Sequence, residues 1–198
     1  MGVSLSSTKP AKRQAILAAA RTEFLTHGYH GGRVERIAAR AGANKQLIFH
    51  YFGSKDGLFA AFVTHTFSTF QGRHQAAASP PEALRRLADD LTAWFAENTG
   101  AAATLSQCCC DHELPHAAAE SASSWMVAVS AQLRSTLDDG QRKGYFRDDI
   151  DHDAVIELIV GYAIGKALSP TGRQVGQGAT APAASLLGRL ISDYCAWR

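Results

Sequence analysis

The chain has 198 residues, 46% of them apolar, and this size supports a folded core in one domain or two small ones. Its longest apolar run, Leu158 to Ile164, is far shorter than the roughly 20 residues of a membrane span, and the first residues lack the pattern of a secretory signal. Three contiguous cysteines and a distant fourth do not have the spacing of a disulfide framework, so we expect a cytoplasmic protein without membrane contact.

The net charge of +2 at pH 7 is unevenly divided along the chain. Residues 1–72 carry nine Lys and Arg against three acidic residues, which gives +6, and the other 126 residues carry 11 against 15, which gives −4. The N-terminal part is therefore suited to a polyanionic partner, whereas the remainder is not.

Apolar periodicity predicts an all-α fold, because alternating β-branched runs bounded by tight turns are absent. Three short helices fit the N-terminal region. The first begins after Pro10 and ends at Gly28, the second ends at Gly42, and the third follows Asn44, a good N-cap residue, and ends before Gly53.

The rest of the chain is predicted to be a helical body. Ser54 is expected to cap a long helix whose aromatic face extends to Phe70. Four further amphipathic stripes cover residues 84–95, 126–137, 155–162 and 186–197. Segments 100–118 and 169–182 are rich in Ala, Gly, Thr and Pro and are predicted to be loops.

Two short helices joined by the turn at residues 40–44 have the spacing of a DNA-reading helix-turn-helix. Gly42 permits the sharp reversal between them. Lys45 and Gln46 begin the second helix, where their side chains suit guanine and adenine edges respectively. An ordinary three-helix corner has the same pattern, but the +6 charge favours double-stranded DNA as the partner.

This region resembles the DNA-binding segment of the TetR family of bacterial transcriptional regulators. The resemblance lies in Ile-Ala at 37–38, Ala-Gly at 41–42 and NKQLIFHYFGSKDGL at 44–58, and it covers about Lys12 to Val63. It implies a homodimer, a repressor more often than an activator, and a C-terminal domain whose small-molecule effector, here unknown, lowers the affinity for a palindromic operator. It implies neither enzymatic activity nor a cofactor.

The resemblance also implies two domains and a set of DNA contacts. Residues 1–53 form the DNA-binding domain, with a flexible arm over about 1–9, and residues 54–198 form the ligand-binding and dimerisation domain. The DNA-binding residues by position are Arg33, Asn44, Lys45, Gln46, Leu47, Phe49, His50, Tyr51 and Lys55. Lys55 is expected to bind a phosphate beside a helix N-terminus.

Two of these positions depart from the family pattern. Phe49 stands where a Tyr is common, and Arg33 stands where a Thr or Ser is common, so the operator sequence stays open. Packing within the helices is an alternative to groove contact for Phe49 and Tyr51. Lys9, Lys12 and Arg13 suit either the adjacent DNA backbone or a solvated basic arm.

In the C-terminal body, two glycines four residues apart on an apolar helix predict a close helix contact, either across a dimer or within one chain. The predicted dimer residues are Leu158, Gly161, Gly165, Leu186, Leu190 and Tyr194. An apolar ligand pocket is predicted from Phe62, Phe67, Trp94, Phe95, Trp125, Met126 and Tyr162. Simple core packing is the alternative for each of them.

The run Cys108 to Cys110, followed by His112 and His116, raises a metal-responsive or thiol-responsive regulator as an alternative. We expect no metal site, because adjacent cysteines do not readily converge on one ion and Pro115 interrupts the helix. Thiol sensing by this segment stays open. A helical enzyme is the third possibility, but the sequence offers no activated nucleophile, paired carboxylates or phosphate-binding glycine loop.

Overall fold

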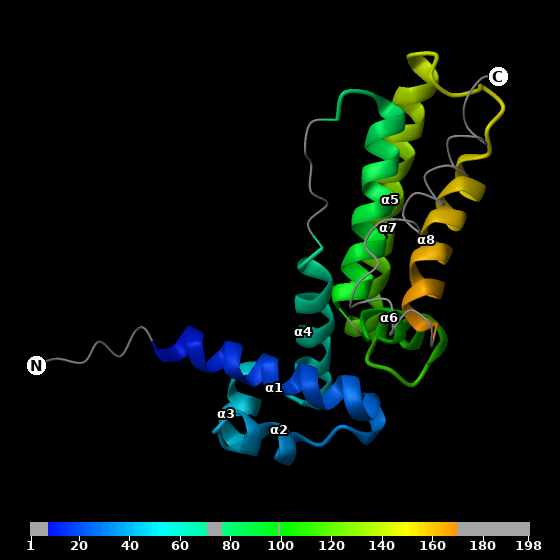
Figure 1. The fold of residues 1–198 in the computed structure, drawn as a ribbon. Coiled ribbons are helices and arrows are strands. Elements are labelled where there is room, and N and C mark those ends of the chain that lie inside the picture. Colours follow the sequence, from blue (N-terminus) through cyan, green and yellow to red (C-terminus); the bar gives the residue numbers. More distant parts are fainter. Residues whose placement is uncertain (1–7, 71–76, 99, 170–198) are drawn as a thin grey trace, which may run out of the picture. The chain divides into compact units, whose positions relative to one another are not determined.

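The computed structural model describes residues 8–70, 77–98 and 100–169, and in these ranges the chain forms eight helices and no strand (Figure 1). The all-α prediction is confirmed. The described residues pack as two compact units. The first comprises residues 8–69 and 104–124, and the second comprises residues 70–103 and 125–169, so helices α6 and α7 are divided between the two units.

The first unit begins with four helices, which are α1 (Thr8–Gly31), α2 (Val34–Arg40), α3 (Lys45–Phe52) and α4 (Lys55–Ser68). They share one apolar core, with α1 packed on both α2 and α4. Its innermost side chains are Ile16, Ala20, Ile37, Ile48, Leu58, Phe59 and Val63. Helix α4 packs on α1 and α3, and the expected domain boundary after residue 53 stays a prediction.

Helix α1 begins at Thr8, before the expected start at Pro10, because proline is tolerated in the first turn of a helix. Gly28 has φ +66° and ψ −177°, so the backbone leaves the helical region where the sequence predicts the end of the helix. A side chain other than glycine is strained at this φ. The break turns residues 29–31 away from the axis of the preceding helix.

Local side-chain caps set the boundaries of the next helices as the sequence predicts. The Asn44 side chain accepts a hydrogen bond from the amide of Leu47 at 2.7 Å, at the start of α3. Ser54 Oγ accepts from the amide of Gly57 at 3.1 Å, at the start of α4. The turn before α3 contains Gly42 with φ +57°, as a sharp reversal between two helices requires.

The remaining helices are α5 (Pro80–Glu97), α6 (Ala101–Cys110), α7 (His116–Arg142) and α8 (His152–Leu168). In the second unit, α5 packs along α8. The core of that unit contains Leu84, Leu91, Phe95, Leu133, Leu137, Phe146 and Ile159. None of the helices that the structure describes has the length and apolarity of a membrane span.

The predicted loop at 100–118 is wrong over most of its length, because α6 occupies Ala101–Cys110. Alanine has the highest helix propensity, and Ala101, Leu105 and Cys108 lie buried at helical spacing. Small residues are common in loops, but here they form a closely packed helix. The predicted stripe at 186–197 and the loop from residue 170 onward lie outside the described residues.

Gly140, near the end of α7, lies directly under the ring of Phe146, and a Cβ atom at this position would lie 2.1 Å from Phe146 Cδ2. We expect Gly140→Ala to lower the free energy of unfolding by about 1–3 kcal/mol, because the buried ring cannot move aside without strain. Urea denaturation measures the change. In a Phe146→Ala background the same substitution should cost little, and an equal cost in both backgrounds would contradict the steric explanation.

Candidate DNA-binding site

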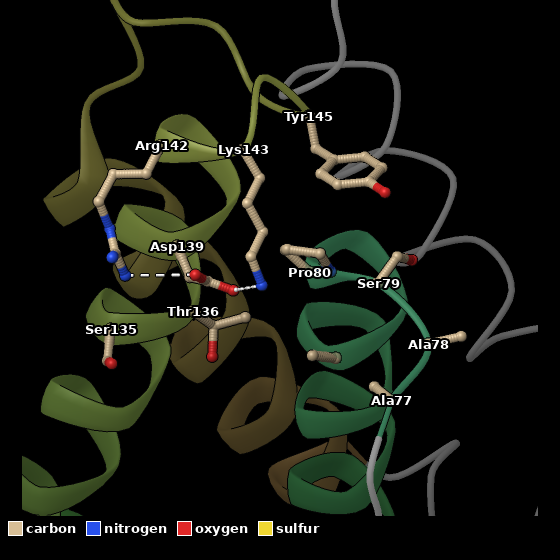
Figure 2. A pocket seen from close by; sticks show the side chains of 11 residues that line it. Ala77, Ala78, Ser79, Pro80, Ser135, Thr136, Asp139, Arg142, Lys143 and Tyr145 are labelled. Atoms are coloured by element: carbon tan, nitrogen blue, oxygen red, sulfur yellow. Dashed lines mark hydrogen bonds and ion pairs between the residues drawn. The ribbon is translucent and has the colours of Figure 1, made fainter.

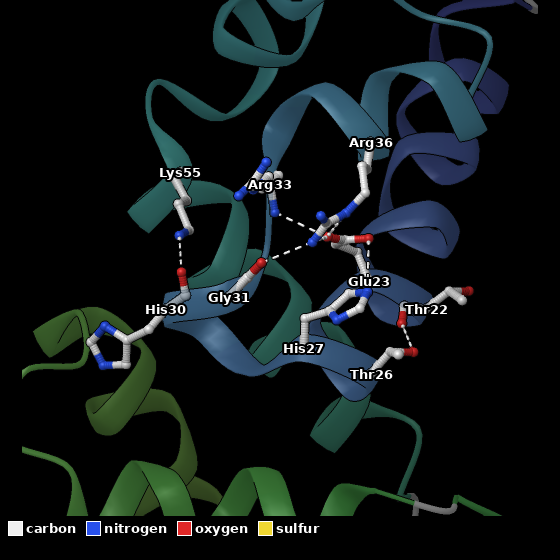
Figure 3. A network of polar contacts seen from close by, with 9 residues as sticks. All are labelled: Thr22, Glu23, Thr26, His27, His30, Gly31, Arg33, Arg36 and Lys55. Carbon is white, nitrogen blue, oxygen red and sulfur yellow. Dashed lines mark hydrogen bonds and ion pairs between the residues drawn. The ribbon is translucent and has the colours of Figure 1, made fainter.

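A buried carboxylate joins α1 to the start of α2 (Figure 3). Glu23 is 2% exposed, and its Oε1 accepts a hydrogen bond from Arg36 Nε at 2.6 Å and another from the backbone amide of Arg33 at 3.0 Å. Arg36 also donates from Nη2 to the carbonyl of Gly31 at 2.9 Å. The guanidinium therefore connects α2 to both the middle and the end of α1.

The hydrogen bond from Arg36 holds the pKa of Glu23 below its ordinary value of 4.5. Burial acts in the opposite direction, and the Arg33 amide adds to the lowering. Because the charged form is the one that these donors stabilise, the carboxylate is ionised at neutral pH. An ionised buried group needs all its donors in place, so α2 is held in one position on α1.

The start of α1 contacts the turn of the helix-turn-helix. Lys12 Nζ donates to the carbonyl of Gly42 at 2.8 Å and lies 3.3 Å from that of Ala41. The Arg13 guanidinium lies 5.2 Å from the ring centroid of Phe52, at the far end of α3. Lys12 therefore satisfies carbonyls at the end of α2, a role that sequence reasoning missed because the partners are about 30 residues apart.

Helix α3 is amphipathic, and the side chain of its residue Ile48 is fully buried. Its other face presents the residues predicted to touch DNA: Lys45, Gln46 and His50 are exposed, and Leu47, Phe49 and Tyr51 are half-buried. Arg33 and Asn44 are exposed just outside the two helices. The six predicted residues on α3 are therefore at least partly accessible, and their individual roles stay predictions.

Lys45 has an acidic partner that sequence reasoning also missed. Its Nζ lies 2.6 Å from Oε1 of Glu35, on the first turn of α2. The same ammonium lies 5.6 Å from the ring centroid of Phe49. The residue expected to read a guanine is therefore already paired in the absence of DNA.

Lys55 lies at the start of α4 against the end of α1. Its Nζ is 4.6 Å from the ring centroid of Tyr29 and 3.4 Å from the carbonyl of His30. The Tyr29 hydroxyl donates to Asp56, and burial together with this carboxylate raises the pKa of Tyr29 to about 12. The phenol therefore stays protonated, and it supports Lys55 beside the helix N-terminus where phosphate binding is predicted.

The residues of the predicted ligand pocket fall into both units. Phe62 and Phe67 are buried in the first unit, each 2% exposed. In the second unit Trp94 and Trp125 have ring centroids 5.5 Å apart, and Trp125 lies 6.0 Å from Phe95. Met126 and Tyr162 are half-buried in the same unit. The rings of Trp94, Phe95 and Trp125 pack against one another within the second unit. A role of the predicted residues in ligand binding stays a prediction.

A polar hollow of about 560 Å³ lies between the start of α5 and the end of α7, within the second unit (Figure 2). Asp139 accepts hydrogen bonds from Lys143 at 2.8 Å and from Arg142 at 3.2 Å across its wall. Its lining contains none of the residues predicted for the ligand pocket. Because one carboxylate is shared by the two cations, the hollow keeps only a small positive charge.

Among the described residues, one face of α8 has no covering neighbour. Leu158 is 48% exposed, and no atom of the described ranges lies within 4 Å of the place where a Cβ would stand on Gly161 or Gly165. Leu168 continues the same face one turn later and is 51% exposed. Three other predicted dimer residues, Leu186, Leu190 and Tyr194, lie outside the described residues.

The three contiguous cysteines end α6 and differ in accessibility. Cys108 is buried, and burial raises its thiol pKa to about 11, so it is unreactive at neutral pH. Cys109 and Cys110 are exposed. Within the described ranges no three His, Cys, Asp or Glu side chains are placed to hold a metal ion. The thiol-sensing alternative is therefore restricted to Cys109 and Cys110.

Comparison with known proteins gives matches over most of the chain. A family model described as bacterial regulatory proteins, tetR family, matches residues 16–62, and a tetracyclin repressor-like C-terminal domain model matches residues 80–169. The transcriptional repressor NicS of Pseudomonas putida is 32% identical over 146 residues, which are 70% of this chain and 67% of NicS. The repressor AcnR of Corynebacterium jeikeium is 26% identical over 179 residues, which are 86% of this chain and 89% of AcnR.

Solved structures support the fold independently. The fatty acid degradation regulator FadR from Bacillus halodurans has a TM-score of 0.72 at 21% identity and covers 90% of this chain and 97% of its own. A TetR-like regulator from a Rhodococcus species has a TM-score of 0.71 at 23% identity, with coverages of 92% and 94%. Both similarities extend through the N-terminal and C-terminal helices.

Replacing Glu23 by Gln should destabilise the protein at neutral pH by about 2 kcal/mol, because two charge-assisted contacts with Arg36 and Arg33 are weakened. Since the folded-state pKa of Glu23 lies below 4.5, its stabilising contribution is present above that pH and is lost as the pH falls through the folded-state value. The difference between wild type and variant in urea denaturation should therefore shrink at acid pH. Glu120→Gln, at an exposed position, is the control, and equal stability of Glu23→Gln and wild type at pH 7 would refute the role of this contact.

Proposed function

The chain belongs to the TetR family of bacterial transcriptional regulators, and from this premise we propose that it is a ligand-responsive repressor that binds a palindromic operator as a homodimer. It is a DNA-binding regulator and not an enzyme. Because its target is chromosomal DNA, we also infer that it acts in the cytoplasm. The similar proteins NicS and AcnR are both named as repressors, which supports repression over activation.

The observation that carries the proposal is the surface of α3. A helix of eight residues with Lys45, Gln46 and His50 exposed has the length and side chains to enter a major groove. The buried side chain of Ile48 packs α3 into the core. The hydrogen bond from Lys12 to the carbonyl of Gly42 holds the turn before it. A recognition helix in a fixed position reads bases with a smaller loss of conformational entropy.

Dimerisation is supported by the open face of α8. Leu158, Gly161 and Leu168 recur at helical spacing on α8, and both leucine side chains are about half exposed. The two glycines allow another helix to approach closely, as in bundles formed by two subunits. Binding to a palindromic operator requires that the two α3 helices of the dimer enter successive major grooves, about 34 to 36 Å apart.

Regulation follows from the same two-fold geometry. An effector that binds more tightly to a dimer with the wrong spacing of its α3 helices shifts the population away from the DNA-binding form. The effector is an unidentified small molecule. We propose that aromatic residues from the predicted pocket, among them Trp94, Trp125 and Tyr162, contact it.

Selection of bound sequences from a random duplex pool should yield an inverted repeat. The combined substitution Lys45→Ala and Gln46→Ala should lower affinity for the selected duplex by about 30-fold or more, because each good base contact contributes at least about 1 kcal/mol. Fluorescence anisotropy measures the affinities. Lys143→Ala removes a lysine from the second unit and should leave binding unchanged. No enrichment over random DNA would contradict the proposed function.

Light scattering should give a mass of twice 21.2 kDa for the wild type. Leu158→Asp should reduce it to 21.2 kDa, because an unpaired carboxylate is strongly disfavoured in an apolar interface. Val127→Asp is the matched control, since Val127 is 65% exposed on α7 and lies outside the predicted interface. A wild-type monomer, or a Leu158→Asp dimer, would show that this face of α8 does not join two subunits.

A further inference from the structure

Glu35 is an acidic residue on the surface that is predicted to approach a polyanion. Of the three acidic residues in positions 1–72, Glu23 is buried with Arg36 and Asp56 accepts from Tyr29. The third, Glu35, is 64% exposed and bonds the ammonium of Lys45 at 2.6 Å. Its carboxylate therefore lies next to a side chain that is predicted to read bases.

This pair contributes little to the stability of the fold. Lys45 is 52% exposed, and an ion pair in contact with water is screened and loses side-chain entropy. The hydrogen bond from Lys45 lowers the pKa of Glu35, so the carboxylate is charged at neutral pH. A carboxylate in the first turn of α2 is favourable for that helix, but this benefit does not require that the carboxylate bond Lys45. We therefore look for the role of the pair in DNA binding.

The geometry suggests what Glu35 does to Lys45. An ammonium group has three N–H donors, and Glu35 occupies one of them, which leaves two for acceptors such as O6 and N7 of guanine. The ring of Phe49, whose centroid is 5.6 Å from the ammonium nitrogen, further restricts the positions that the ammonium can take. A lysine without these neighbours is a mobile point charge that binds any phosphate within reach.

We propose that Glu35 is a specificity-determining residue that positions Lys45 toward base edges and cancels its charge toward phosphates. Affinity for random DNA comes from Lys and Arg contacts with phosphates and the release of counterions. Glu35 removes Lys45 from that set, so it lowers affinity for random DNA more than affinity for the operator. The inference rests on the proposed function and adds one residue to its recognition surface.

The test compares wild type with Glu35→Gln, which keeps the size of the side chain and removes its charge. Both proteins are titrated against the selected duplex and a random duplex of equal length, in a salt series from about 50 to 200 mM. We expect the variant to bind random DNA several-fold more tightly, with a slope of log affinity against log salt that is steeper by about 0.9 for each subunit engaged. Operator affinity should change less, so the ratio of the two affinities should fall several-fold.

A double-mutant cycle separates positioning of Lys45 from simple repulsion of phosphates. In a Lys45→Ala background, Glu35→Gln should leave the affinity ratio and the salt slope unchanged, because the ammonium it acts on is gone. Glu97→Gln makes the same change of net charge at an exposed position on α5 and should match the wild type. Equal thermal unfolding midpoints will show that the folds are intact.

The outcomes distinguish this inference from the proposed function. Wild-type protein with no preference for any duplex overturns both. A wild-type preference that Glu35→Gln leaves unchanged, or an effect of equal size in the Lys45→Ala background, overturns the inference about Glu35 alone. A lower ratio that requires Lys45 supports it.

Discussion

The position of α3 depends on how α2 is held against α1, and the contact that holds it is the buried carboxylate of Glu23. A buried charge is tolerated only when donors surround it, so a displaced α2 would leave Glu23 without Arg36 and the Arg33 amide. This penalty fixes the position of α2 relative to α1. The hydrogen bond from Lys12 on α1 to the carbonyl of Gly42 also fixes the turn that precedes α3.

The positive charge of the first 72 residues serves two purposes. Arg36 and Lys12 bind acceptors within the protein, and the half-buried Lys55 lies over the ring of Tyr29. These three cations therefore stabilise the structure of the protein itself, in the absence of DNA. A net charge of +6 therefore describes the attraction toward a polyanion, but the number of lysines and arginines free to bind phosphates is smaller.

The features that the sequence predicts correctly are local. Asn44 and Ser54 cap helices through partners three residues away, and residue type and spacing alone indicate such contacts. The pairs Lys12 with Gly42, Glu23 with Arg36 and Glu35 with Lys45 join residues on different helices, and no periodicity reveals them. The sequence does not predict α6, because a run of small residues has no strong amphipathic pattern even where it packs closely.

The pairing of Lys45 with Glu35 has a consequence for how the regulator finds its target. A chromosome offers roughly 10⁶ or more competing sites, and a protein that adheres to them is depleted from solution. When each random encounter is weaker by a given factor, dwell times on wrong sites shorten by a similar factor and more molecules are free to search. In the role proposed for it, one surface carboxylate thereby reduces the number of protein copies that a cell needs to keep a single operator occupied.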